Sequence, residues 1–266
     1  MRPLLLLPLL LLFAACSQAP DGPEPLVVGM ELAYPPFEMT DEQGNPTGMS
    51  PDMARSLADY LGRPLEIRNM SFDGLIPALK TGSIDLIISS MTANEERAQS
   101  IDFSDPYVNT ELSLLVGKDS GVKSIDDLRS PDRVIAVKLG TTGHVYAKNH
   151  LQEATLRVLE KENACVMEVV QGKADAFVFD QMSVYQNAKQ HPETTDAIFK
   201  SFQRESWAIG INKGNPVLKS RVNAFLKEFR ADGGFERLGD SYLGNFQSAF
   251  RDLGIPFVFD IPETVK

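Results

Sequence analysis

Arg97 stands in a sequence context that favours binding chemistry. It follows Asn94-Glu95-Glu96, a few residues after the apolar run 84–90. Asn94 is a good helix N-cap, so Arg97 is expected in a first helical turn, where a cation opposes the helix dipole and needs an anion nearby. That anion is either a neighbouring glutamate, in a surface ion pair worth little, or a ligand carboxylate held by two parallel hydrogen bonds. The spacing leaves both interpretations open.

The segment Gly140-Thr141-Thr142-Gly143 is a candidate anion site. It lies between an expected strand at 133–137 and an expected helix at 144–151. Its glycines permit a tight turn, and exposed N–H groups with two hydroxyls can hold an anion. The alternative is a plain capped turn, since the full phosphate-binding pattern is missing.

Three charged residues lie close to the ends of apolar runs. Asp180 and Glu31 each come directly after such a run, and Lys138 precedes Gly140. Each has either a local structural role, such as helix capping, or pairs with an opposite charge. Tyr34 and Phe72 lie near strand ends as well, where an aromatic ring either walls a pocket or fills the core.

Catalytic signatures are missing from the sequence. His144, His150 and His191 lack the spacing of metal ligands, and no cysteine joins them. There is no Gly-x-Ser-x-Gly elbow, phosphate-binding loop or dinucleotide glycine fingerprint. We therefore expect a protein that is not an enzyme, with no catalytic residue, no metal and no cofactor.

The elements that position these residues alternate between strand and helix. Apolar runs at 26–30, 65–69 and 84–89 predict strands, and the segments 51–61 and 72–80 between them predict helices. This order predicts a βαβ unit with a parallel sheet. The pattern then restarts with a strand at 133–137, a helix at 144–151 and a strand at 176–179.

A short sequence echo supports two related halves. Gly172-Lys-Ala-Asp-Ala176 repeats the pattern of Gly82-Ser-Ile-Asp-Leu86, and each segment enters an apolar strand. Because only two copies exist, we expect two similar α/β lobes and not a repeat array. A strand at 207–212, a long helix at 216–231 and a short helix at 235–242 complete the expected elements.

The first residues predict export. Residues 1–15 have the positive head, apolar middle and small final residues of a signal peptide. Phe13-Ala-Ala-Cys16 resembles a bacterial lipobox, which predicts lipidation at Cys16; the alternative is an ordinary secretory signal cut near Ala15. Residues 16–25 then form a flexible tether. With Cys16 acylated, Cys165 has no disulfide partner and is expected to be a buried hydrophobe.

The formal net charge is −10. This balance argues against a nucleic-acid partner, which needs a basic surface. It also argues against adsorption to an anionic membrane, so membrane attachment would depend on the N-terminal lipid only.

Taken in order, these segments resemble one family, the extracytoplasmic solute-binding proteins of polar amino-acid ABC transporters (bacterial solute-binding protein family 3). The resemblance runs from about residue 26 to residue 244. Its densest block is Phe72-Asp-Gly-Leu-Ile-Pro-Ala-Leu-Lys-Thr-Gly-Ser-Ile-Asp-Leu-Ile-Ile-Ser-Ser-Met-Thr92, continuing through Arg97 to Ile101-Asp-Phe-Ser-Asp-Pro-Tyr107.

The resemblance implies the fold and its domains. We expect an α/β protein with the two-lobed periplasmic-binding-protein fold (Venus flytrap, type II), whose lobes are joined by two hinge strands. Lobe 1 would comprise 26–110 and 205–266, and lobe 2 would comprise 111–204. The protein would be a monomer, periplasmic or otherwise extracytoplasmic, and lipid-anchored to a bacterial membrane.

The resemblance also implies roles for individual residues. Arg97 would bind the ligand α-carboxylate, and Asp180 would bind the α-ammonium. Tyr34 and Phe72 would wall the ligand side chain. The remaining predicted ligand-binding residues are Ser90, Thr92, Thr141 and Thr142 for the carboxylate, with Glu31 and Lys138 for the side chain.

The function implied is high-affinity binding of a polar amino acid and its delivery to ABC transporter permease subunits. Glu31 and Lys138 favour a basic or amide ligand, namely arginine, lysine, histidine or glutamine. Ser50-Pro51-Asp52 and Glu31 depart from the usual family residues, which leaves the ligand open. The alternatives are a lyase like the cyclohexadienyl dehydratases on the same scaffold, or a solute-sensing lipoprotein.

Overall fold

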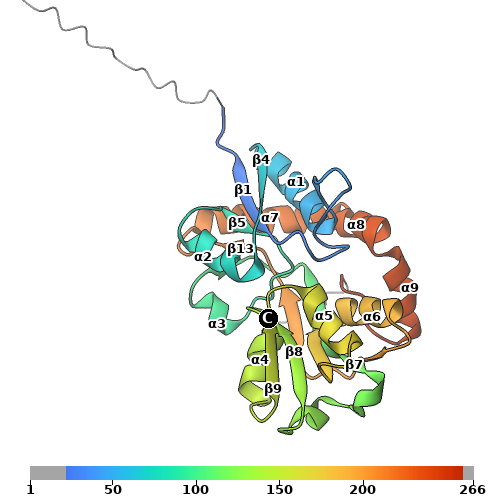
Figure 1. The fold of residues 1–266 in the computed structure, drawn as a ribbon. Coiled ribbons are helices and arrows are strands. Elements are labelled where there is room, and N and C mark those ends of the chain that lie inside the picture. Colours follow the sequence, from blue (N-terminus) through green and yellow to red (C-terminus); the bar gives the residue numbers. More distant parts are fainter. Residues whose placement is uncertain (1–21, 260–266) are drawn as a thin grey trace, which may run out of the picture.

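The computed structural model describes residues 22–259, which form two α/β lobes, one above the other in Figure 1. The predicted signal peptide, the lipidation site Cys16 and most of the predicted tether lie outside the described residues. Within residues 22–259, no helix combines the length and the apolar character that crossing a membrane requires.

The upper lobe is built on a five-stranded sheet. In spatial order its strands are β4 (Leu65–Asn69), β1 (Leu26–Met30), β5 (Leu86–Ile87), β13 (Gly210–Ile211) and β6 (Asp102–Phe103). Strand β1 runs parallel to both neighbours, as the βαβ pattern predicts, whereas β13 is antiparallel to β5 and β6. Its helices are α1 (Met49–Leu61), α2 (Leu75–Lys80), α3 (Glu95–Ala98), α7 (Pro216–Ala231) and α8 (Gly234–Tyr242).

The lower lobe is built on a second sheet. In spatial order its strands are β11 (Thr195–Ile198), β7 (Val108–Gly117), β10 (Ala176–Asp180), β8 (Val134–Lys138) and β9 (Thr155–Leu159). Strands β8, β9 and β10 are parallel, and β7 is antiparallel to β10. Its helices are α4 (Thr142–His150), α5 (Glu162–Val170) and α6 (Gln181–Gln190). Cys165 on α5 is buried among apolar residues, as expected.

Two strands cross between the lobes. Strand β7 leaves the upper lobe, and β12 (Arg204–Trp207) returns to it, pairing antiparallel with β7 from Arg204↔Glu111 to Trp207↔Val108. The predicted lobe boundaries at 110/111 and 204/205 fall within this ladder and stay a prediction. Helix α9 (Gly244–Asp252) adds a further contact, because Phe246 and Phe250 pack against Tyr185 of α6.

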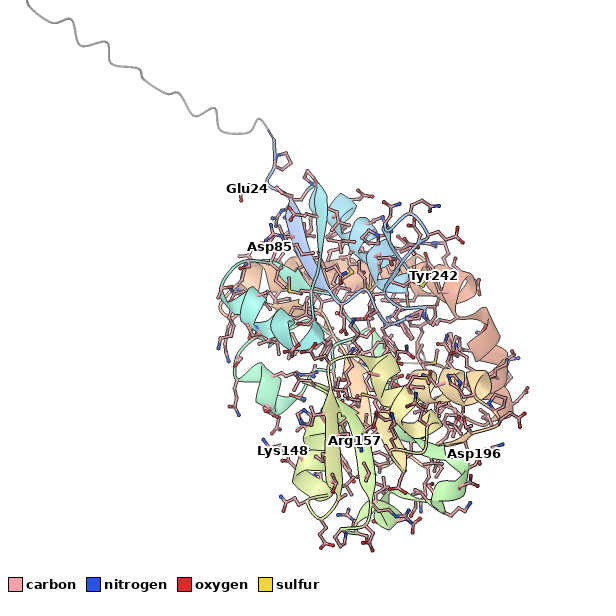
Figure 2. The ribbon with its side chains drawn as sticks, in the orientation of Figure 1. Glu24, Asp85, Lys148, Arg157, Asp196 and Tyr242 are labelled. Atoms are coloured by element: carbon pink, nitrogen blue, oxygen red, sulfur yellow. The ribbon has the colours of Figure 1, made fainter. Side chains whose placement is uncertain are left out.

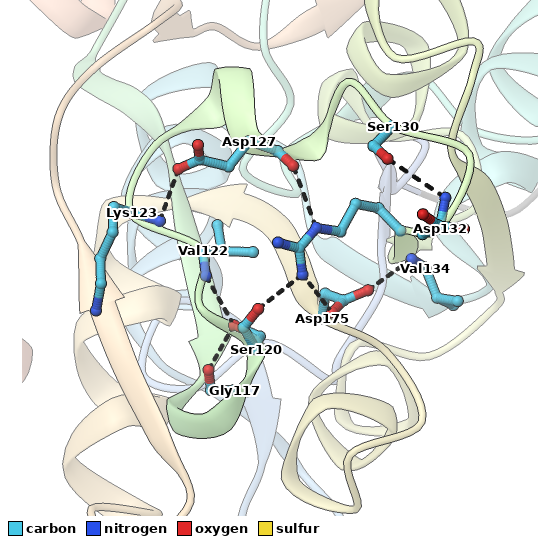
Figure 3. Close-up of polar contacts among 10 residues, drawn as sticks. Gly117, Ser120, Val122, Lys123, Asp127, Ser130, Asp132, Val134 and Asp175 are labelled. Carbon is cyan, nitrogen blue, oxygen red and sulfur yellow. Dashed lines mark hydrogen bonds and ion pairs between the residues drawn. The ribbon is translucent and has the colours of Figure 1, made fainter.

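The sequence echo corresponds to the same hydrogen-bonding arrangement in both lobes, in which an aspartate accepts from a backbone N–H and from an arginine. Asp85, just before β5, accepts hydrogen bonds from Val27 N (3.0 Å) and Arg63 Nη2 (2.8 Å). Asp175, just before β10, accepts from Val134 N (2.7 Å) and from the Nη1 of Arg133 (2.9 Å). Figure 2 labels Asp85 in the upper lobe, and Figure 3 shows Asp175 beside Val134. Each aspartate ties the start of a central strand to its neighbour.

Several predicted elements have different bounds in the structure. The strand predicted at 84–89 is limited to Leu86–Ile87, and the strand predicted at 207–212 is divided into β12 and β13. The helix predicted at 72–80 begins with a 3-10 turn, Phe72–Gly74, before α2. The sequence analysis did not predict β7, β9, β11 or α6.

Candidate ligand-binding site

One cavity between the lobes brings all ten predicted ligand-binding residues together. It encloses about 470 Å³ of space, part of it open to solvent. The predicted residues that line it are Glu31, Tyr34, Phe72, Ser90, Thr92, Arg97, Lys138, Thr141, Thr142 and Asp180. Six further lining residues were not predicted: Glu38, Ser89, Leu112, Phe179, Glu205 and Trp207.

The cavity lies where strands of both sheets end. Glu31 follows β1, Lys138 is the last residue of β8, and Asp180 is the last residue of β10. The carboxyl ends of parallel strands meet at one edge of a sheet, and ligands of open α/β sheets bind there. The two sheets present these edges to each other, so residues far apart in sequence share one cavity.

Arg97 is a partly buried cation that forms no ion pair in the described part of the chain. Asn94 caps α3 by accepting from Arg97 N (2.9 Å), which confirms the predicted cap. The guanidinium donates to Thr92 O (2.6 Å) and, across the cleft, to Gly140 O (2.9 Å). Among residues 22–259 no carboxylate oxygen lies within 4.0 Å of it. Burial lowers the pKa of Arg97 to about 10, so it stays charged at neutral pH.

Asp180 is buried and caps α6. Its Oδ1 accepts from Met182 N (3.0 Å), Ser183 N (3.2 Å) and, from the other lobe, the Tyr34 hydroxyl (2.7 Å). These three donors all use one oxygen, so Oδ2 retains its capacity to accept. Burial raises the pKa of Asp180 to about 6, which leaves the carboxylate mostly ionised at neutral pH. The capping role is therefore real, and it does not exclude pairing with a cation.

Glu31 and Lys138 pair with each other across the cleft. The Lys138 ammonium donates to Glu31 Oε2, and both side chains are almost fully buried. The ring of Phe72 lies 5.5 Å from the Lys138 Nζ and also 5.5 Å from the Arg97 guanidinium carbon. Both cations therefore lie within the distance at which a positive charge is attracted to the face of the Phe72 ring.

The two hydroxyl-bearing segments differ in how their side chains are used. Thr141 caps α4, donating to Lys138 O (2.7 Å) and accepting from His144 N (3.4 Å). Thr142 is the first residue of α4 and lines the cavity.

Ser90 has a φ of 48°, which is uncommon for a residue other than glycine. Strained backbone of this kind clusters at functional sites.

Two unpredicted carboxyl groups also line the cavity. Glu38 is 1% exposed and accepts from the hydroxyls of Ser50 (2.7 Å) and Ser90 (3.1 Å). Burial raises the pKa of Glu38 to about 8, so it carries its proton at neutral pH. Glu205, on the crossing strand β12, is 6% exposed and accepts from the Thr92 hydroxyl (3.0 Å).

The aromatic wall of the cavity is continuous with the core of the upper lobe. Tyr34 stacks on Phe37 and meets the edges of Phe179 and Trp207. Tyr34 and Trp207 thus line the cavity and also belong to the hydrophobic core.

The described residues include no group of three or more His, Cys, Asp or Glu side chains that could hold a metal ion.

Two α/β lobes, two crossing strands and a polar cavity between the lobes define the periplasmic-binding-protein fold. Residues 26–245 match the family described as bacterial extracellular solute-binding proteins, family 3. The protein belongs to this family, as the sequence motifs predicted.

Relatives within this family are amino-acid-binding proteins. The L-cystine-binding protein TcyJ of Escherichia coli (strain K12) is 28% identical over 221 residues, covering 82% of each chain. The L-arginine-binding protein of Pseudomonas aeruginosa is 30% identical over 232 residues, covering 82% of this chain and 88% of the relative. A solved structure, the ancestral amino acid-binding protein AncCDT-1, a precursor of cyclohexadienyl dehydratase, is 38% identical with a TM-score of 0.76, covering 82% of this chain and 94% of that one.

Proposed function

We propose that this protein binds a polar amino acid between its lobes, outside the cytoplasmic membrane, and delivers it to the permease of an ABC transporter. The observation that carries the proposal is a cavity in which, among residues 22–259, the Arg97 guanidinium pairs with no carboxylate and Oδ2 of Asp180 accepts no hydrogen bond. A buried charge without a partner is costly. A zwitterion with its two charges a few ångströms apart compensates both.

The ligand main chain is recognised by both lobes. Arg97, with Ser90 and Thr92, binds the α-carboxylate from the upper lobe, and Thr141 and Thr142 approach it from the lower lobe. Asp180 accepts the α-ammonium through Oδ2. Because the ligand contacts both lobes at once, it binds the closed form better than the open form, and this difference drives closure.

The side-chain subsite contains the Glu31–Lys138 pair, with Tyr34 and Phe72 as its walls. Glu31 favours a cationic side chain, in line with the arginine-binding relative, whereas the pair as a whole suits an amide, which both donates and accepts. Glu31→Gln distinguishes these ligands. It should weaken arginine or lysine more than glutamine, and an equal effect on all three would remove Glu31 from the subsite.

The test of the proposed function is a thermal-shift screen of the twenty amino acids and L-cystine, since a ligand that binds only the native state raises the melting temperature. Arg97→Ala should then abolish the shift and reduce calorimetric affinity at least 100-fold, because the carboxylate loses a charge-assisted pair of about 3 kcal/mol. No shift with any amino acid, or unchanged affinity in Arg97→Ala, would reject the proposal.

A lyase activity is the second candidate. AncCDT-1 is described as a precursor of a dehydratase, and Glu38 supplies a protonated carboxyl group that lines the cavity, as a general acid must. Incubation with prephenate or arogenate tests this activity directly. We expect no aromatic product, and product formation that Glu38→Gln abolishes would establish the enzyme.

We also propose that Cys16 carries the lipid that retains the protein at a bacterial membrane. Support comes from the sequence Phe13-Ala-Ala-Cys16. Metabolic labelling with palmitate should mark the wild-type protein and leave Cys16→Ala unlabelled and released. Release of the wild-type protein without label would favour the ordinary secretory signal.

A further inference from the structure

Glu205 is a buried carboxylate of the crossing strand β12 that lines the ligand cavity. Its Oε2 accepts from the Thr92 hydroxyl (3.0 Å), and its Oε1 accepts from Gln203 Nε2 (2.9 Å). A carboxylate has about four lone-pair positions. Each oxygen of Glu205 can therefore accept a second hydrogen bond from a group in the cavity.

Glu205 and Asp180 are two carboxylates that line the cavity and form no ion pair within the part of the chain that the structure describes, although the charge of Glu205 raises the pKa of the nearby Arg97. Within residues 22–259, no lysine, arginine or histidine nitrogen lies within 4.0 Å of either carboxylate. By contrast, Glu31 is neutralised by Lys138. Burial raises the pKa of Asp180, and the charge of Glu205 raises it further, so the two carboxylates are close enough to repel each other. Both gain from a positive group placed between them.

Thr92 contacts both the Glu205 carboxylate and the Arg97 guanidinium. Its carbonyl oxygen accepts from Arg97 Nη1 (2.6 Å), while its hydroxyl donates to Glu205. A cation and a carboxylate are thus held on two sides of one residue without meeting. Both charged groups therefore lie within one residue of the same point of the cavity lining, one on the backbone of Thr92 and one on its side chain.

We propose that Glu205 is a second acceptor for the ligand ammonium, which is held between Asp180 of the lower lobe and Glu205 of the crossing strand. Glu205 thereby selects for ligands that carry an amine beside the carboxylate. The inference rests on the proposed function and adds a specificity-determining residue to it. It also places part of the binding site on a strand that joins the two lobes.

The experiment compares affinities for an amino acid and for the analogue in which hydrogen replaces the α-amino group. The probes are L-arginine with 5-guanidinopentanoate and L-glutamine with glutaramate, followed by L-histidine and L-cystine with their analogues if neither binds. Wild type should prefer each amino acid that it binds. Glu205→Gln, which keeps the shape and the acceptor for Thr92, should weaken the amino acid about tenfold and leave the analogue within about twofold.

Two variants separate charge recognition from folding. Glu111→Gln removes a carboxylate from the same β7–β12 ladder, where Glu111 pairs with the exposed Arg204 and does not line the cavity; it should keep the wild-type ratio. Glu205→Asp retains the charge and should retain most of the preference. The melting temperature of each unliganded variant shows that it is folded.

The outcomes distinguish the two proposals. If wild type binds amino acids but Glu205→Gln keeps the same preference over the analogues, Glu205 does not bind the ammonium and the proposed function stands. The same conclusion follows if Glu111→Gln lowers the preference equally. If wild type binds none of the twenty amino acids and not L-cystine, the proposed function fails and the inference with it.

Discussion

At the scale of single residues, Asp180 shows how one carboxylate serves the fold and the site together. Its Oδ1 takes the two backbone donors of α6 and the Tyr34 hydroxyl, and its Oδ2 faces no donor within the described residues. The same burial that makes an unpaired carboxylate costly raises its pKa to about 6. The affinity for an amino-acid ligand should therefore depend on whether Asp180 is protonated.

We predict that amino-acid affinity falls as the pH drops through about 6. An ammonium ligand needs ionised Asp180, so calorimetric affinity should be about tenfold lower at pH 5 than at pH 7.5. Tyr34, Glu162 and Glu205 also lie near this carboxylate. Comparison with Asp180→Asn shows how much of the pH dependence of binding comes from Asp180 itself. That variant should bind weakly at both pH values, with a flat profile. A profile in Asp180→Asn as steep as in wild type would assign the titration to another group.

Glu38 should make the protein less stable as the pH rises. Its pKa is raised by burial from 4.5 to about 8, so the folded state keeps a proton that the unfolded state has lost. Stability is therefore lost between about pH 4.5 and 8. Glu38→Gln cannot ionise, and its urea-unfolding free energy should gain about 2–4 kcal/mol over wild type between pH 5 and pH 8.5. Parallel pH profiles for the two proteins would contradict this.

The sequence analysis predicted most residues that line the cavity, but it did not predict the buried carboxyl groups that contact them. All ten predicted residues line it, although their roles stay predictions. Glu38 and Glu205 carried no signal because nothing near them in sequence marks them as buried. Glu205 reaches the cavity only through the pairing of β12 with β7, and such long-range pairing is invisible in a single local window.

At the scale of elements, the paired aspartates explain the echo between the halves of the chain. Asp85 and Asp175 each accept from one backbone N–H near the start of a neighbouring strand, Val27 of β1 and Val134 of β8, and from an arginine. Both lie where their strands begin, and the cavity residues lie where the strands end. The echo therefore marks the framework of the sheets and not the binding site.

Asp175→Ala should destabilise the protein by about 2–3 kcal/mol without changing amino-acid affinity. The change removes the acceptor of Val134 N and one of the three acceptors of Arg133, and hydrogen bonds to a charged group are worth about 1.5–3 kcal/mol. Urea unfolding measures the loss. The control is Asp196→Ala, an exposed residue of β11, which should stay within about 0.5 kcal/mol of wild type. A tenfold loss of affinity in Asp175→Ala would show that the edge of the sheet where the strands begin affects the binding site at the opposite edge.

Element boundaries were predictable where one face is strongly apolar. Strands 26–30 and 65–69 and the helix 216–231 match the structure. The predicted strand 84–89 is shorter because the chain leaves the sheet towards the cavity and adopts a positive φ at Ser90. Strand β9 was not predicted, although its residues are exposed or half-buried like those of the predicted strand 65–69.

At the scale of the whole molecule, closure depends on how closely the lobes approach at Gly140. Gly140 has a φ of 76°, and a Cβ there would lie 3.2 Å from the Cβ of Asp73 in the opposite lobe. Its carbonyl also accepts from Arg97 across the cleft. The missing side chain thus allows the two lobes to come together beside the proposed carboxylate site.

Gly140→Ala should reduce amino-acid affinity about tenfold. Alanine at a positive φ costs about 1 kcal/mol wherever it occurs, so the control is Gly172→Ala, which has a φ of 66° and open space around it. Both variants should lose similar thermal stability, and only Gly140→Ala should lose calorimetric affinity. Equal affinities in the two variants would show that closure tolerates the extra methyl group.

Trp207 gives this molecule a natural optical probe. It is the single tryptophan of the sequence, it is 2% exposed, and it lines the cavity beside Tyr34. Its indole lies on β12, the strand that also carries Glu205. Any solute that enters the cavity changes the surroundings of this one fluorophore, so intrinsic emission follows loading and release in real time, in unlabelled wild-type protein.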